Sequence, residues 1–133
     1  DKNSGSSNFL ENEYFKINII FAQREPKVMI VIFDKDYLEE LYSKGKTDDK
    51  RHRFQPDIVK RYKKRIDILK RALNIEELST IHSLNYEVLK GDKAGISSIR
   101  VNNQYRIEFT VSNQDSETIV YICNILELSN HYK

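Results

Sequence analysis

The spacing of apolar residues changes between residues 73 and 84, and that change limits the folds this chain can adopt. Between residues 56 and 73, apolar side chains recur every three or four positions, as on one face of an α-helix. From residue 84 onward the spacing is two, which is typical of β-strands with one buried face. Helical segments followed by a run of strands predict an α+β domain, with its helices packed against a sheet.

The sequence pattern also predicts where the individual helices and strands begin and end. We expect a small antiparallel or mixed sheet of about five strands, with two to three helices on one face. The expected helices span residues 35–44, 56–73 and 74–81, and the expected strands span residues 29–33, 84–90, 96–101, 105–111 and 118–125. The strand at 29–33 is wholly apolar and should be central. Asp36 and Glu39 have the spacing of a capping box, as have Asn74 and Glu77, and Gly45 should end the first helix.

The first 28 residues stand apart from this pattern. Met29 opens the first apolar strand, so we expect residues 1–28 to be an N-terminal extension and residues 29–133 to be the main domain. Within the extension, apolar residues alternate and predict an extra strand at 14–22. Such a strand would either add to a sheet edge or occupy a groove that a partner protein would use, and its exchange between two copies would give a homodimer.

Positive charge is concentrated in one part of the chain. Residues 44–71 hold twelve Lys or Arg against four Asp, a net charge of +8, whereas the whole chain carries +2. A block of this kind attracts phosphate backbones or an acidic protein. The alternative is a well-solvated helix face, and charge alone does not decide between them.

The remaining composition excludes several classes. A single cysteine, Cys123, cannot form an internal disulfide, which favours a reducing compartment such as the cytoplasm. Its apolar surroundings predict a buried packing role. No apolar run approaches the roughly 20 residues of a membrane span. Three separated histidines and one cysteine lack the spacing of a zinc site, so neither a metal nor a cofactor is expected.

Two arginines mark the most informative stretch, residues 89–109. If Ile107 and Phe109 face the core, then Arg106 and Glu108 face the other side of the sheet. A hairpin turn would place Arg100 directly opposite Arg106, and like charges so placed are destabilising. Either Glu108 compensates for this, or an anionic ligand such as a phosphate does. Nearby lysines would add to the same positive cleft.

The stretch "LKGDKAGISSIRVNNQYRIEF", followed by a strand and a terminal "NHYK", resembles the HigB-type killer toxins of the RelE-like superfamily. "RFQPDIVKRYKKRIDILKRA" is similar to their second helix, and the resemblance covers residues 29–133. It implies a RelE-like fold and a type II toxin that acts as a ribosome-dependent, metal-independent endoribonuclease. In such chemistry the ribose 2′-hydroxyl of the messenger RNA attacks the neighbouring phosphate. The partner it implies is a cognate antitoxin, commonly a small helix-turn-helix protein.

The resemblance also assigns residues. Arg106 would stabilise the phosphate, His131 matches the C-terminal histidine and is the acid or base candidate, and Tyr132 would stack on a base or donate a proton. The residues expected to bind substrate are Lys90, Lys93, Arg100 and Tyr105.

This chain departs from the family pattern at two places. Many relatives carry a histidine where this chain has Glu87, which either serves as a base or pairs with a lysine. Relatives that end in Asp-Tyr-His differ from the Ser129-Asn130-His131 of this chain. These departures leave open a non-catalytic RNA or ribosome binder, and a protein-interaction module whose basic helix 56–73 docks an acidic partner.

Overall fold

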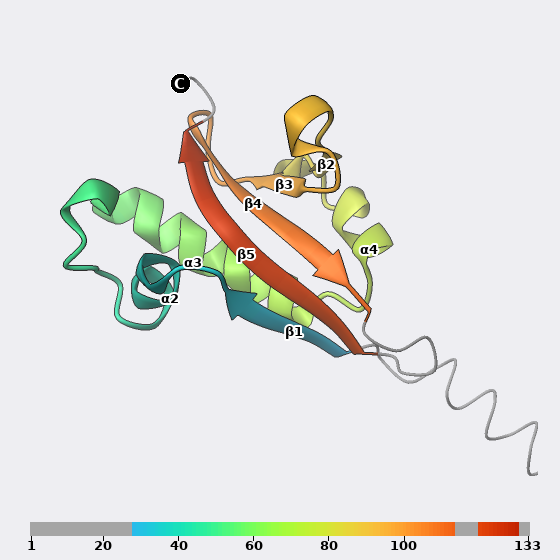
Figure 1. Cartoon of the computed structure of the whole chain (residues 1–133), viewed down its shortest axis with the longest axis horizontal. Coiled ribbons are helices and arrows are strands. Elements are labelled where there is room, and N and C mark those ends of the chain that lie inside the picture. The colour runs from blue at the N-terminus through green and yellow to red at the C-terminus, as the bar shows by residue number, and fades with distance from the viewer. Residues whose placement is uncertain (1–27, 114–119, 131–133) are drawn as a thin grey trace, which may run out of the picture.

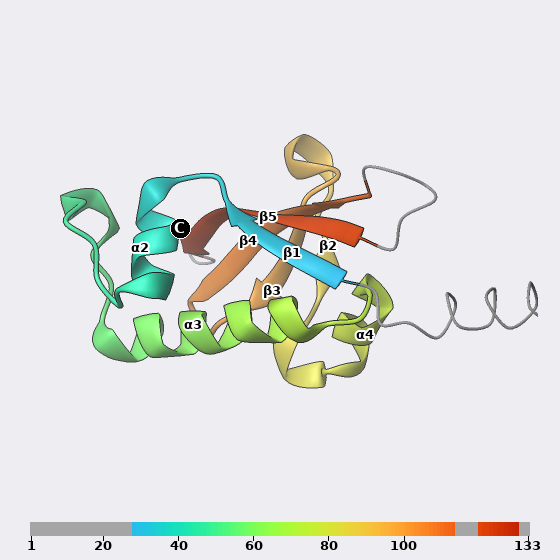
Figure 2. The same ribbon diagram turned by 90° about the horizontal axis from the view of Figure 1, so that it is seen from below.

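Five strands of the described part of the chain form one sheet, and helices pack against it (Figure 1). The computed structural model describes residues 28–113 and 120–130. The elements are β1 (Val28–Phe33), α2 (Asp36–Ser43), η1 (Lys50–His52), α3 (Pro56–Arg71), α4 (Ile75–Thr80), η2 (His82–Leu84), β2 (Glu87–Val88), η3 (Gly91–Lys93), β3 (Ser97–Arg100), β4 (Tyr105–Ser112) and β5 (Val120–Asn130). The strand order is β1-β5-β4-β3-β2, with β1 parallel to β5 and the other neighbours antiparallel. The mixed sheet confirms the predicted α+β class, and α3 runs along one face of it (Figure 2).

Strand β1 lies at an edge of the described sheet, so the prediction that it is central was wrong. Among the described strands only β5 pairs with it. Ile30 and Ile32 are 44% and 45% exposed, whereas Met29 is buried. The apolar run therefore does not reflect burial on both faces. The strand predicted at 14–22 lies outside the described residues, as do residues 1–27 of the predicted extension.

Helix α3 buries most of its predicted apolar stripe. The buried members, each 5% exposed or less, are Ile58, Tyr62, Ile66 and Leu69. Leu73 is 46% exposed because the helix ends two residues before it, where the helical period no longer sets its direction. The Tyr62 hydroxyl donates to the carbonyl oxygen of Leu38 in α2 at 2.7 Å, which joins the two helices. Burial raises the pKa of Tyr62, so the hydroxyl stays a neutral donor.

The structure agrees with some of the predicted helix ends and not with others. Helix α2 starts at Asp36, and its N-cap residue Lys35 makes no side-chain capping bond, so the capping box predicted there was wrong. Gly45 follows α2 with φ +76°, a conformation that favours glycine and ends the helix. In α4 the predicted cap is confirmed, because the side chain of Asn74 accepts from a backbone N–H of the first turn at 2.8 Å.

The strand predicted at 84–90 is reduced to Glu87–Val88. Residues His82–Leu84 form a short 3-10 turn before it, and Asn85 has φ +44°. A left-handed residue interrupts extended backbone, so the strand cannot begin earlier. The turn Gly91–Lys93 then leads into β3.

Strands β3 and β4 form the predicted hairpin at the centre of the core. Ile107 and Phe109 are fully buried, as predicted, and Val101 is 1% exposed. Cys123 of β5 is also fully buried, and burial raises the pKa of its thiol to about 12. The thiol is therefore neutral at physiological pH and has the packing role that was predicted for it.

A β-bulge interrupts the pairing of β4 with β5. On one side of it Phe109 pairs with Ile125, and on the other side Glu108 pairs with Glu127, so β5 holds one extra residue. Ile125 and Leu128 are both buried although they lie three positions apart. The bulge therefore shifts the alternation of β5 and decides which of its last residues face the open side of the sheet.

Candidate functional site

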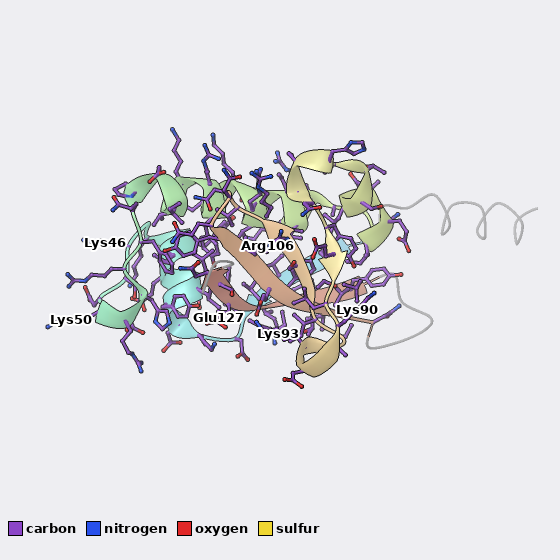
Figure 3. All side chains as sticks on the ribbon, turned by 90° about the horizontal axis from the view of Figure 1, so that it is seen from above. Lys46, Lys50, Lys90, Lys93, Arg106 and Glu127 are labelled. Atoms are coloured by element: carbon purple, nitrogen blue, oxygen red, sulfur yellow. The ribbon has the colours of Figure 1, made fainter. Side chains whose placement is uncertain are left out.

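A small polar hollow contains Arg106 on the sheet face opposite the core. It has a volume of about 210 Å³. Its charged lining residues are Glu87, Lys93, Arg106 and Glu108, and its polar lining residues are Ser98, Ser129 and Asn130. They come from β2, the turn before β3, and strands β3, β4 and β5. Figure 3 shows Arg106 over the middle of the sheet, with Lys90 and Lys93 to one side.

The Arg106 side chain is held largely out of solvent. Only 15% of it is exposed, and its Nη1 lies 3.7 Å from Oε1 of Glu87. That contact is an ion pair beyond hydrogen-bond distance, and Nη1 is buried with no hydrogen-bond partner among the described residues. A buried N–H without an acceptor is unfavourable. The hollow therefore presents an unsatisfied cationic donor that an anionic oxygen would satisfy.

Glu87 pairs with this arginine. A lysine was the ionic partner that the sequence offered as one of two alternatives. Oε1 of Glu87 also accepts from Asn85 Nδ2 at 3.3 Å. The Glu87 side chain is 47% exposed, so it reaches both the arginine and the solvent.

A second ion pair closes one side of the hollow. Lys93 Nζ lies 2.7 Å from Oε2 of Glu108, which is buried. The hydrogen bond to Glu108 raises the pKa of Lys93. Glu108 therefore compensates Lys93, whereas the sequence offered it as compensation for the two arginines.

Three polar residues of the hollow were not predicted. Ser98 is 1% exposed, and its Oγ has no hydrogen-bond partner among the described residues. Strand alternation could have identified Ser98, because it lies two residues before Arg100 and directly opposite Glu108, and so on the same face of the sheet. Ser129 stands opposite Arg106 only because of the bulge, and Asn130 follows it. A bulge leaves no clear signal in a single sequence.

Arg100 is paired with Arg106 as predicted but lines a different hollow. The register places the two arginines opposite each other. Arg100 ends β3, however, and its guanidinium contacts the side chain of Asn103 in the turn. It lines a hollow of about 450 Å³ together with Arg61 and Arg65 of α3. The predicted single cleft with both arginines is therefore two separate hollows that share no lining residue.

Two other predicted binding residues lie outside the Arg106 hollow. Lys90 is exposed just before η3 and is not among the residues that line it. Tyr105 packs edge-on against Phe54, with ring centroids 5.3 Å apart. Of the four predicted substrate-binding residues, Lys93 alone lines the hollow of Arg106.

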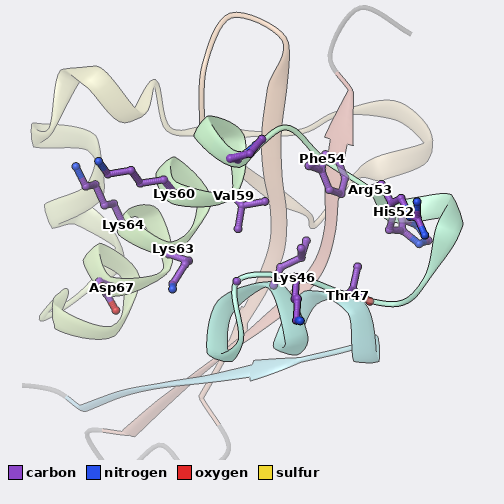
Figure 4. Close-up of a pocket in the computed structure, with 13 residues that line it drawn as sticks. Lys46, Thr47, His52, Arg53, Phe54, Val59, Lys60, Lys63, Lys64 and Asp67 are labelled. Atoms are coloured by element: carbon purple, nitrogen blue, oxygen red, sulfur yellow. The ribbon is translucent and has the colours of Figure 1, made fainter.

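A larger hollow lies elsewhere, between α2, α3 and the loop that joins them (Figure 4). Its volume is about 710 Å³. The apolar lining residues are Leu41, Phe54, Pro56 and Val59, and the basic lining residues are Lys46, Arg53, Lys60, Lys63 and Lys64. The carboxylate that lines it, Asp67, already accepts from the hydroxyl of Tyr42 at 2.5 Å. This hollow combines apolar surface with excess positive charge and shares no lining residue with the Arg106 hollow.

The predicted acid and base residues at the C-terminus, His131 and Tyr132, lie outside the described residues. Asn130, which directly precedes His131, lines the Arg106 hollow. Within residues 28–113 and 120–130, no three His, Cys, Asp or Glu side chains gather closely enough to hold a metal ion. None of the helices described there is long and apolar enough to cross a membrane.

Comparisons with known proteins assign the family. The model of the family described as HigB-like toxin, a RelE-like toxin of the type II toxin-antitoxin system HigB, matches residues 31–123. Toxin HigB-1 of Vibrio cholerae is 35% identical over 82 residues, which are 61% of this chain and 82% of that protein. The solved YoeB/ParE toxin from Agrobacterium tumefaciens is similar with a TM-score of 0.45 and 21% identity, covering 78% of this chain and 100% of that one. The chain therefore belongs to the HigB-like family of RelE-like toxins from type II toxin-antitoxin systems, and such a toxin has a cognate antitoxin as its partner.

Proposed function

We propose that this toxin is an endoribonuclease that cleaves messenger RNA on the ribosome and so inhibits translation in the bacterial cytoplasm. The observation that carries the proposal is the Arg106 guanidinium, which is held in a polar hollow with one donor nitrogen unsatisfied among the described residues. Family membership supports the same activity.

The reaction proposed is an attack by the ribose 2′-oxygen on the adjacent phosphorus. A bond forms between the 2′-oxygen and phosphorus, the bond to the 5′-oxygen breaks, and the products are a cyclic phosphate and a free 5′-hydroxyl. One proton passes from the 2′-hydroxyl to a base, and an acid supplies one to the 5′-oxygen. Negative charge grows on the phosphate oxygens during attack, and Arg106 would stabilise it. The step proceeds through side chains and requires no metal ion.

The base and acid are proposed from their positions. Glu87 lies beside Arg106 and is half exposed, which supports the role of base for a phosphate bound at that arginine. His131 follows the hollow residue Asn130 and has a side chain suited to proton transfer near neutral pH, so we propose it as the acid. Tyr132 would stack on a base of the RNA or donate in its place. The ribosome would orient the RNA, so few protein groups are needed.

The test is cleavage of a defined messenger RNA in a reconstituted bacterial translation system, read by primer extension. We expect the full-length chain to cut the RNA with ribosomes present and to leave naked RNA intact. His131→Ala should slow cleavage by about 10²-fold or more, the usual contribution of an acid or base. A folded wild-type chain that binds ribosomes without cutting would instead establish the non-catalytic binder.

A second role is favoured by the large hollow between α2 and α3, namely docking of an acidic segment of the cognate antitoxin. Its basic rim would attract carboxylates, and its apolar residues would accept side chains from the same segment. Free RNA offers no comparable apolar surface except its bases.

Charge reversal tests this docking role. Lys60→Glu combined with Lys63→Glu should weaken the complex with the purified cognate antitoxin by about 10-fold, roughly 1.4 kcal/mol, by titration calorimetry. Lys50→Glu, at an exposed lysine that does not line the hollow, is the control. Equal affinity of the double variant and the control, or displacement of the antitoxin by RNA, would place the antitoxin elsewhere.

A further inference from the structure

Three arginines line the hollow between α3 and the β3–β4 turn. Arg61 and Arg65 lie on successive turns of α3, and Arg100 lies at the end of β3. The hollow has a volume of about 450 Å³, and the carboxylate that lines it belongs to Asp57. Among the described residues, no ion pair involves any of these three arginines. The hollow therefore has three positive side chains and one negative one, and none of the arginines is held in an ion pair among the described residues.

The arrangement is fixed by the fold. Arg65 Nε donates to the carbonyl oxygen of Arg100 at 2.9 Å, which ties the helix to the strand. The Arg100 guanidinium is held against the side chain of Asn103. Partial burial lowers the pKa of Arg65, and the charges of Arg61 and Arg100 lower it further. Like charges four residues apart on a helix are destabilising, so the cluster opposes folding slightly. An anion in the hollow would relieve this repulsion.

The lining favours phosphate over a protein carboxylate. Besides the arginines it holds polar residues, Ser83, Asn102 and Asn103, and Val101 is its apolar member. Planar guanidinium forks bind phosphate oxygens in pairs, and a phosphate has enough acceptors for more than one fork. The lysine-rich hollow over α2 differs, because four apolar residues line it.

Position connects this hollow to the proposed active site. Arg100 and Arg106 are direct cross-strand partners, so their Cα atoms are separated by about 5 Å, the usual spacing in an antiparallel pair. We propose that the arginine hollow (Arg61, Arg65 and Arg100) binds a backbone phosphate of the same RNA strand that Arg106 holds. The strand would cross the β3–β4 turn between the two hollows. This inference rests on the proposed function, because it takes the substrate to be single-stranded RNA.

The experiment measures RNA binding separately from cleavage. The probe is a fluorescein-labelled, 2′-O-methyl 12-nucleotide RNA, which lacks the attacking hydroxyl, and the readout is anisotropy from 50 to 200 mM salt. Arg61→Ala with Arg100→Ala should weaken binding by about 10-fold or more. The slope of log Kd against log salt should fall by about 0.7, the value for one lost phosphate contact on a single strand. Arg65→Ala should act in the same direction and Arg65→Lys should restore part of the affinity, because lysine keeps the charge but not the fork.

Controls make the outcomes separable. Lys50→Ala with Arg71→Ala removes the same charge at exposed positions that do not line the arginine hollow, and melting curves establish that all variants fold. Equal affinity and slope in the arginine double variant and this control would overturn the inference. Displacement of the RNA by an equal concentration of polyglutamate would overturn it as well and assign the hollow to an acidic protein. If the arginine double variant binds RNA more weakly but the wild-type chain never cleaves on ribosomes, the inference stands and the proposed activity is rejected. If the wild-type chain cleaves on ribosomes but the double variant binds RNA as tightly as the control, the proposed activity stands and the inference is rejected.

Discussion

Replacing Arg106 with alanine should lower the rate of messenger RNA cleavage on ribosomes by about 10²- to 10³-fold, the usual effect of removing one preorganised group that stabilises transition-state charge. The guanidinium is only 15% exposed and, among the described residues, is ion-paired to Glu87, so burial restricts its position before the RNA arrives. The substitution should change the rate of the chemical step more than the affinity, because the charge it stabilises grows during attack. Single-turnover cleavage at saturating toxin measures that step directly.

Three comparisons make this result specific. Arg106→Lys should recover part of the rate, because it keeps the positive charge and loses the fork. Arg71→Ala, an exposed arginine at the end of α3, should cleave as the wild type does. Loss of Arg106 leaves Glu87 half exposed to water, so the variant should stay folded. A folded Arg106→Ala variant that cuts within about threefold of the wild-type rate would remove Arg106 from the proposed site.

The alternation of β4 was enough to predict which of its residues line the hollow. Period two assigns Ile107 and Phe109 to the core and places Arg106 and Glu108 on the other face, and the structure agrees. The same rule did not predict which hollow Arg100 lines. Arg100 is the last residue of β3, and beyond the end of a strand the alternation no longer sets the direction of a side chain. There the guanidinium contacts the side chain of Asn103 in the turn, and this contact sets its direction.

The partners within the site were beyond sequence reasoning for a different reason. Charge pairing depends on which of several nearby groups comes within about 4 Å, and residue order does not determine that distance. The sequence offered Glu108 as one possible partner of the arginines and a lysine as one possible partner of Glu87. The structure pairs Glu108 with Lys93 and Glu87 with Arg106. The bulge in β5 could not be predicted from the sequence either. It moves Ser129 into the hollow without changing the hydrophobic composition of the strand.

Phe109→Ala should lower the free energy of unfolding by about 3–5 kcal/mol, the range for removing a buried aromatic side chain. Phe109 is fully buried and pairs with Ser97 on one side and Ile125 on the other. Because the free energy of unfolding of domains of this size is roughly 5–15 kcal/mol, this loss would be a large fraction of the stability of the protein. Urea denaturation followed by circular dichroism measures it, with the slope against urea unchanged if unfolding stays two-state.

The position of Phe109 links this loss to the site. The bulge lies between Glu108 and Phe109 in the pairing of β4 with β5. Phe109 is therefore next to the bulge on one side, and Glu108 and Arg106 lie on the other side. Val111→Ala, at a half-buried residue of the same strand, should lower the free energy of unfolding by less than half as much. At temperatures where Phe109→Ala is still folded, its cleavage rate should fall more than that of Val111→Ala, because a cavity beside the bulge would let Arg106 and Ser129 shift. Equal cleavage rates in the two folded variants would mean that the bulge is held by its backbone pairing alone, and that the Phe109 side chain acts on stability without positioning the hollow.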